Sequence, residues 1–226
     1  MRRLLFGIFA LTLAVGCGGS EKKGDNQAAE EVATEQTSTE VKVALPAPGE
    51  LNGHVWIDLG LSVKWATCNI GANNMHEYGD YYAWGETSTK ARYIGGTCST
   101  YNVSMKAING NGRYDAATTN WGEGWRTPTQ EEYQELIDKC SWKWMTQNGV
   151  SGYSVKGPSG NSIFLPAAGI RHDYDLHDVG NRAYYWSSSP HQTIHALSVC
   201  LYFKSDRMYT DHNDRGTGCS IRPVCD

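Results

Sequence analysis

Histidine, aspartate, tyrosine and asparagine are concentrated in three short segments of the C-terminal third of the chain, residues 171–178, 190–195 and 204–217. We expect each segment to be a loop between two strands, and side chains of these types bind ligands through short polar or aromatic groups. If the strands place the loops together, their side chains line one exposed face; ordinary solvated loops are the alternative. The ligand-binding candidates are His172, Tyr174, His177, His191, Tyr209, His212 and Asn213.

The same segments do not have the spacing of a known metal site. Residues 172–178 contain two histidines and three aspartates, but not at the regular intervals that place ligands on one side of a helix. Residues 211–222 begin like a calcium-binding loop, yet Arg215 stands where a third ligand is needed and Arg222 replaces the final glutamate. We therefore expect no bound metal and no other cofactor.

No arrangement typical of a catalytic site is present either. The serines at 187–189 lack the G-x-S-x-G turn of hydrolases. Glu123, between two tryptophans, is a possible acid for glycoside hydrolysis, but its surroundings predict a tight turn before a helix. Cys200 and Cys219 are the one pair that could bind copper, and a structural disulfide is the simpler interpretation. We expect no catalytic residue.

The first 16 residues are organised like a signal peptide. Two arginines precede an apolar run, residues 4–16, which is shorter than the roughly 20 residues that span a bilayer. The run ends in Leu-Ala-Val-Gly-Cys at residues 13–17, which resembles a lipobox, the site where a bacterial signal peptidase cuts before a lipidated cysteine. We expect removal of residues 1–16 and a lipid on Cys17 that anchors the protein in the cell envelope, with the outer membrane favoured and the membrane face left open. An ordinary signal peptide with a chance cysteine is the alternative.

Export also bears on the six other cysteines. An even number of cysteines in an exported chain favours disulfides, and no C-x-x-C pair suggests zinc or redox chemistry. We expect at least two disulfides, with Cys200–Cys219 among the possible pairs. The candidates are Cys68, Cys98, Cys140, Cys200, Cys219 and Cys225.

Composition divides the rest of the chain into a tether and a folded domain. Residues 17–50 are rich in Glu, Thr, Gln, Ala and Gly and cannot bury enough apolar surface to fold, so we expect a disordered tether. Residues 51–226 have the composition of one globular domain. The formal net charge is −4 without a basic segment, which argues against a nucleic-acid partner.

One helix and several short strands are expected in the domain. Thr129 and Glu132 form a capping-box pattern, and Tyr133, Leu136, Ile137 and Cys140 recur at helical spacing, so a helix should begin after Thr129 and bury that face. In residues 196–203 alternating apolar residues predict a half-buried strand. The other expected strands are residues 54–58, 62–69, 152–156, 162–165, 184–188 and 219–224. This order predicts an α+β fold with antiparallel pairing.

Six segments resemble, in order and spacing, the Fibrobacter succinogenes major paralogous domain, a family common in lipoproteins of gut Bacteroidetes. The segments are WIDLGLSVKWATCN (56–69), YGDYYAWGE (78–86), NWGEGWRTPT (120–129), NSIFLPAAG (161–169), YYWSSS (184–189) and SIRPV (220–224). The resemblance covers about residues 53–225, with Thr127 and Ile221 as departures. It implies a C-type-lectin-like fold, related to the formylglycine-generating-enzyme group, in which the N- and C-terminal strands pair and an irregular region displays loops. The resemblance brings a scaffold, and function must still be argued from the site.

These observations together predict a lipid-anchored, non-enzymatic binding or display domain. Its partners are expected to be a membrane, through Cys17, and a glycan or protein ligand. A structural envelope protein without a small ligand is one alternative. A divergent enzyme of the formylglycine-generating-enzyme-like fold is the other.

Overall fold

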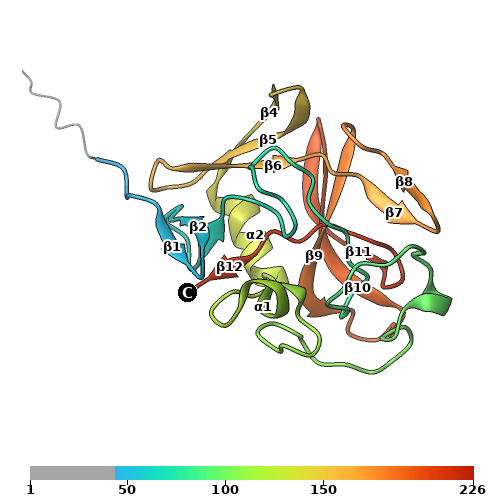
Figure 1. Cartoon of the computed structure of the whole chain (residues 1–226). Helices are drawn as coiled ribbons and strands as arrows, with labels where there is room; N and C mark the ends of the chain where they lie inside the picture. The colour runs from blue at the N-terminus through green and yellow to red at the C-terminus, as the bar shows by residue number, and fades with distance from the viewer. Residues whose placement is uncertain (1–43) are drawn as a thin grey trace, which may run out of the picture. The chain divides into compact units, whose positions relative to one another are not determined.

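The computed structural model describes residues 44–226, and the two ends of this range meet in one sheet. The four strands of the sheet are β1 (Gly49–Leu51), β2 (His54–Ile57), β3 (Lys64–Ala66) and β12 (Val224–Cys225). Their order is β1-β2-β3-β12, and Val224 pairs with Trp65 across the antiparallel junction of β3 and β12. Figure 1 shows the C-terminus beside β1 and β2. The pairing of N- and C-terminal strands that the resemblance implied is therefore present.

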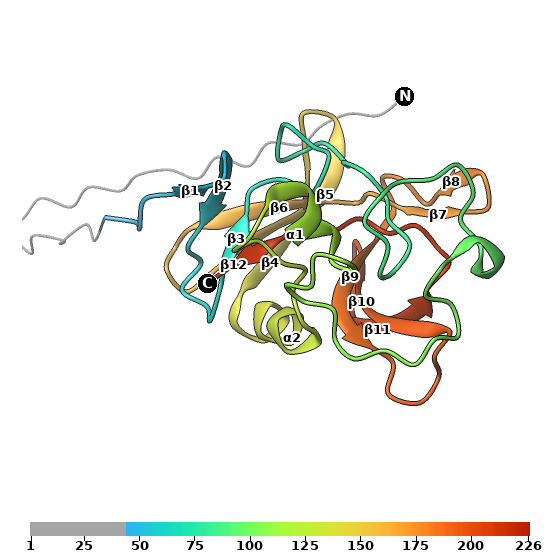
Figure 2. The same ribbon diagram turned by 60° about the horizontal axis from the view of Figure 1, so that its bottom comes forward.

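A second sheet lies between two apolar clusters. It consists of β9 (Arg182–Pro190), β10 (Leu197–Lys204) and β11 (Arg207–Asp214), in the order β11-β10-β9 (Figure 2). Leu201 of β10 belongs to the cluster that contains α2, whereas its neighbour Cys200 belongs to the other. Both faces of β10 are thus covered, and the expectation of a half-buried strand was wrong because the apolar pattern did not reveal the second cluster.

The remaining strands form a three-stranded sheet and a hairpin. The sheet is β4 (Ser141–Gln147), β5 (Val150–Lys156) and β6 (Ser162–Pro166), and the hairpin is β7 (Ile170–His172) with β8 (Asp175–His177). On β4, the rings of Trp142 and Trp144 lie 5.3 and 5.0 Å from the ring of Tyr153. Both tryptophans pack against the apolar cluster that contains α2. These two tryptophans therefore contribute to the core.

Helix α2 (Gln130–Lys139) begins where the capping pattern predicted. The Thr129 hydroxyl accepts the Glu132 N–H at 3.2 Å, and the Glu132 carboxylate accepts the Thr129 N–H at 2.8 Å. Tyr133 and Leu136 are fully buried, which confirms the predicted inner face. Two shorter helical segments, α1 (Ala116–Trp121) and η1 (Gly95–Thr97), were not predicted.

The described residues thus have an α+β fold of mainly antiparallel strands, as predicted, with four further local corrections. Residues 171–178, expected to be a loop, mostly belong to strands β7 and β8. Residues 49–50, assigned to the tether, belong to β1, where the Trp56 ring packs so closely over Gly49 that no side chain fits. Most of residues 204–217, expected to be a loop, form β11. Its sequence is mostly polar on both faces, with Met208 as the one aliphatic residue, and therefore has no apolar alternation to mark it as a strand. In residues 219–224, only Val224 belongs to a regular strand.

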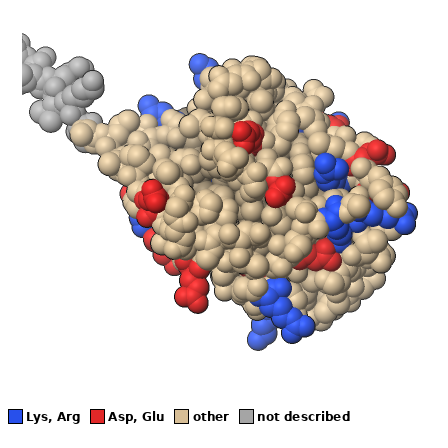
Figure 3. Space-filling view, in the orientation of Figure 1, with Lys and Arg blue, Asp and Glu red and all other residues tan. Residues whose placement is uncertain are grey.

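Cys17, the expected signal peptide at 1–16 and residues 18–43 of the tether lie outside the described residues. Within residues 44–226, no helix has both the length and the apolar character needed to span a membrane. Figure 3 shows acidic and basic residues scattered over one face, with broad uncharged areas between them.

The six cysteines of the domain are free thiols in the structure, which differs from the expected two or more disulfides. Cys98 and Cys140 lie in separate apolar clusters and cannot meet. Cys200, Cys219 and Cys225 lie in one further apolar cluster, but no two of them form a disulfide. Burial raises the pKa of Cys140 to about 11 and also raises the pKa of Cys200 and Cys219. These thiols therefore behave as small apolar core groups.

A buried arginine connects three distant parts of the chain. Arg222 is 0 % exposed, and no carboxylate contacts it in the described structure. Its guanidinium donates to the Asn69 side chain at 2.8 Å and to the Ala66 and Thr67 carbonyls at 3.1 and 2.9 Å. A fourth bond, of 3.0 Å, reaches the Phe164 carbonyl in β6. Arg222 thus joins the residues after β3 to β6 and to the C-terminal segment.

Candidate functional site

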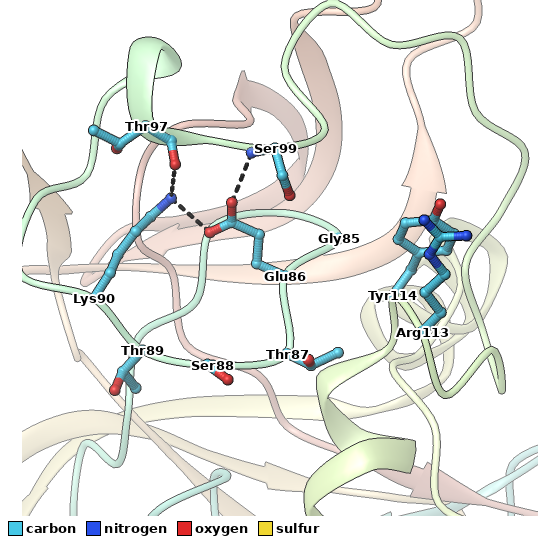
Figure 4. A pocket seen from close by; sticks show the side chains of 10 residues that line it. All are labelled: Gly85, Glu86, Thr87, Ser88, Thr89, Lys90, Thr97, Ser99, Arg113 and Tyr114. Carbon is cyan, nitrogen blue, oxygen red and sulfur yellow. Dashed lines mark hydrogen bonds and ion pairs between the residues drawn. The ribbon is translucent and has the colours of Figure 1, made fainter.

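An open pocket of about 470 Å³ lies between three loops that precede α2 (Figure 4). Serine and threonine hydroxyls, one ion pair, a tyrosine and an arginine surround it. We call it the hydroxyl pocket, and its lining residues are Gly85, Glu86, Thr87, Ser88, Thr89, Lys90, Thr97, Ser99, Arg113 and Tyr114. Its size lies in the range of small-molecule sites.

The ion pair between Glu86 and Lys90 is held in place by the backbone. The Lys90 Nζ lies 2.5 Å from the Glu86 Oε2 and donates to the Thr97 carbonyl at 2.8 Å. The Glu86 Oε1 accepts the Ser99 N–H at 2.7 Å. Both side chains are mostly buried, with exposed fractions of 15 % for Glu86 and 19 % for Lys90. One ammonium hydrogen and several carboxylate lone pairs remain for a ligand, and they are already oriented.

Arg113 and Tyr114 form the opposite wall (Figure 4). The guanidinium carbon of Arg113 lies 5.2 Å from the centre of the Tyr114 ring, which orients the cation along the ring. Arg113 is exposed and forms no ion pair with any described residue. This wall therefore offers a free positive charge beside an aromatic ring.

Asp115 fixes the position of this wall. Its carboxylate is fully buried and accepts the N–H groups of Gly110 and Ala117 at 2.8 and 2.9 Å. It also accepts the backbone N–H of Thr127 at 2.9 Å and the Thr127 hydroxyl at 2.6 Å. Asp115 is the N-cap of α1, so a single side chain ties the 110–114 loop to α1 and to the segment before α2.

A second buried arginine supports the pocket from behind. The Arg215 guanidinium lies 4.2 Å from the centre of the Trp84 ring and donates to the Thr100 and Val103 carbonyls at 3.1 and 2.8 Å. The Thr100 hydroxyl in turn donates to the Trp84 carbonyl. Burial lowers the pKa of Arg215. Residues 84–85 and 100–103 are therefore held against each other, and the loops on either side form the pocket.

A smaller pocket of about 250 Å³ adjoins the hydroxyl pocket, and Tyr114 lines both. We call it the 103–114 pocket. Its lining residues are Val103, Ser104, Met105, Lys106, Ala107, Ile108, Asn111 and Tyr114.

Three of the seven predicted ligand-binding residues lie together on the β7–β8 hairpin. His172, Tyr174 and His177 are all exposed there, and Tyr174 at the turn is 63 % exposed. The Arg92 guanidinium lies 5.4 Å from the centre of the Tyr174 ring and is paired with Asp173 at 2.6 Å. The hairpin therefore presents a supported aromatic side chain.

The other four predicted residues are divided between the two faces of β11. Tyr209 and Asn213 are separated by an even number of positions and share one face, whereas His212 points to the other. The His191 ring lies 4.4 Å from that of His212, while the Asn213 amide reaches the Cys219 sulfur at 3.7 Å. The prediction that all seven side chains line a single face was therefore wrong, because a loop interpretation ignores the alternation of a strand.

No protein-family model, curated protein or solved structure matches the chain. The function is therefore argued from the site itself. Across residues 44–226, no three His, Cys, Asp or Glu side chains are grouped closely enough to hold a metal ion. Cys200 and Cys219 do not fit a copper site either, because their full burial favours the neutral thiol, whereas a metal needs accessible thiolates.

The sequence interpretation missed the residues of the hydroxyl pocket. Glu86 ends a segment that resembles the family scaffold, and the resemblance gives this residue no role in binding. Residues 91–120 are rich in Gly, Asn, Ser and Thr and predict a long surface loop of a kind that is often functional, but they do not indicate which side chains bind. The polar run Glu-Thr-Ser-Thr-Lys at 86–90, directly after an aromatic segment, was the one local signal.

Proposed function

We propose that the domain is a non-enzymatic binding domain whose ligand is a saccharide held in the hydroxyl pocket. The observation that carries this proposal is the Glu86–Lys90 pair among five serine and threonine side chains. Sugar hydroxyls both donate and accept hydrogen bonds, and this lining supplies partners of both kinds. The Tyr114 ring adds an apolar face for the C–H groups of a sugar.

The lining residues favour binding over hydrolysis. Glycoside hydrolysis commonly needs two carboxylates on opposite sides of the scissile bond. Glu86 is the one carboxylate that lines the pocket among the described residues, and it is already engaged by Lys90 and by the Ser99 N–H. A histidine would be a suitable general base, but none of the described residues that line the hydroxyl pocket is a histidine.

The proposal is tested by filling the pocket. Ser88 lines the pocket and is exposed, so Ser88→Trp should occupy the site without disturbing the core. On an array of neutral and acidic glycans, we expect the full-length protein to bind and Ser88→Trp to lose about tenfold or more in affinity, equivalent to about 1.4 kcal/mol.

Ser205→Trp is the matched control, because Ser205 is exposed in the turn between β10 and β11 and lines neither pocket. It should bind like the unmodified protein. Glycan binding that survives Ser88→Trp would contradict the proposal, as would cleavage of the bound glycan. Binding that instead requires Tyr174 would move the site to the β7–β8 hairpin and favour a protein ligand.

We also propose that the domain is C-type-lectin-like and is displayed on the cell envelope by a lipid on Cys17. The antiparallel β3–β12 junction and the long loops between strands support the fold assignment, together with the resemblance to the Fibrobacter succinogenes major paralogous domain. The charged, apolar and Gly-Cys order of residues 2–17 supports the anchor.

Cys17→Ser should leave the protein unprocessed or release it from membranes. Without the thiol no diacylglycerol is attached to residue 17. Even one acyl chain at the N-terminus would then bind a membrane only weakly and reversibly. Membrane fractionation with mass measurement of the N-terminal peptide checks this. A cleaved Cys17→Ser protein that still sediments with membranes would contradict lipid anchoring, and Cys68→Ser is the control for loss of an unrelated thiol.

A further inference from the structure

Two adjoining pockets share Tyr114, and the cations on their rims have no acidic partners among residues 44–226. Arg113 stands at the rim of the hydroxyl pocket and Lys106 at the rim of the 103–114 pocket. Both side chains are exposed, and neither forms an ion pair with a described residue. Together with the paired Lys90, the two pockets contain three cations and one carboxylate, that of Glu86.

We propose that the two pockets form one extended site for an acidic oligosaccharide, a sugar chain that carries carboxylates or sulfates. This inference rests on the proposed function and specifies its ligand class. The hydroxyl pocket holds one unit of the chain, the 103–114 pocket holds a neighbouring unit, and the Tyr114 ring packs against the sugars where the pockets meet.

The two pockets have different linings, and each has its own cation, which suits two neighbouring units of a charged sugar chain. The hydroxyl pocket provides many hydroxyls and the fixed Glu86–Lys90 pair, which suit the hydroxyls of a sugar ring. The 103–114 pocket offers Ser104 and Asn111 as hydrogen-bonding groups beside apolar Val103 and Met105. Arg113 on one rim and Lys106 on the other can each pair with an acidic group on the sugar unit beside it.

The arrangement of Arg113 favours an anion more specifically than an isolated surface cation would. Its backbone N–H donates to the Asn111 side chain at 3.0 Å, and its guanidinium lies along the Tyr114 ring. Asp115, two residues after Arg113, directs its carboxylate into the protein, where its acceptor sites are used by backbone and threonine donors. The guanidinium therefore remains available for a carboxylate or sulfate, which it binds in a bidentate geometry.

The test compares acidic and neutral oligosaccharides of equal length by calorimetry on the full chain in detergent. The probes are an oligogalacturonate, a sulfated heparin fragment and a neutral galactan fragment. We expect at least one acidic probe to bind about tenfold more tightly than the neutral one at low salt. Arg113→Gln and Lys106→Gln should each weaken that binding by about two- to fivefold, as for single exposed charge pairs, and added salt should reduce it further.

Lys143→Gln is the matched control, because Lys143 is exposed on β4 and lines neither pocket. It should leave all affinities unchanged. Preference for the heparin fragment would identify sulfate as the recognised group, and preference for oligogalacturonate would identify carboxylate. Equal binding of the neutral probe, lost in Ser88→Trp but not in Arg113→Gln, would overturn the acidic ligand and leave saccharide binding intact. Failure of every probe and of the glycan array would overturn both.

Discussion

Replacing Asp115 with asparagine should lower the free energy of unfolding by about 3 kcal/mol, since charge-assisted hydrogen bonds contribute roughly 1.5–3 kcal/mol each. The carboxylate accepts from four donors and contributes no hydrogen of its own. An asparagine amide would direct N–H groups at some of the same N–H donors and leave them buried without acceptors. Urea denaturation followed by circular dichroism measures the change.

Asp138→Asn is the control, because Asp138 is exposed on α2 and its replacement should change stability by less than about 0.5 kcal/mol. The Asp115 variant should also bind saccharide less tightly, since the 110–114 loop carries one wall of the pocket. A loss of stability no larger than that of Asp138→Asn would show that the buried carboxylate does not organise this region.

Removing the Arg222 side chain should have the largest effect on stability in the domain. Arg222→Ala leaves the Asn69 side chain and the Ala66, Thr67 and Phe164 carbonyls without their donor and opens a cavity in a fully buried site. Each buried acceptor that loses its donor costs about 1–3 kcal/mol, and the cavity adds to this loss. We expect Arg222→Ala to unfold at much lower urea concentration or to fail to accumulate.

Arg222→Lys keeps the charge but cannot reach all four acceptors, so it provides a measurable intermediate case if the alanine variant does not fold. We expect it to be destabilised by about 2 kcal/mol, between the unmodified protein and Arg222→Ala. Arg207→Ala, on the exposed start of β11, should be close to neutral. An Arg222→Lys protein as stable as the unmodified one would contradict the role assigned to the guanidinium fork.

The sequence predicted those parts of the fold that are determined by neighbouring residues. The α2 helix was predicted correctly because its cap and its buried face are contained in residues 129–140. Strand β11 was missed because it is polar on both sides, and its conformation comes from pairing with β10 along its whole length. A loop assignment for β11 also led to the error about the binding face, since alternation sends His212 and Asn213 to opposite sides.

The candidate site was less predictable for a related reason. The hydroxyl pocket depends on contacts between residues far apart in the chain, such as the Ser99 N–H with Glu86 and the Thr127 donors with Asp115. No local pattern in residues 86–90 reveals that Arg113 will face them. Arg222, by contrast, lies in a segment that resembles the family scaffold, and it binds carbonyls in the core.

The β3–β12 junction has a consequence for the order in which the protein can fold. Residues 64–66 pair with residues 224–225, so the first sheet cannot close until nearly all of the described chain is available. The Arg222 bonds to residues 66–69 impose the same delay. Folds dominated by such distant pairings form slowly and as a unit. Strands β1, β2 and β3 can pair among themselves, but the free edge of β3 stays uncovered until residues 224–225 arrive.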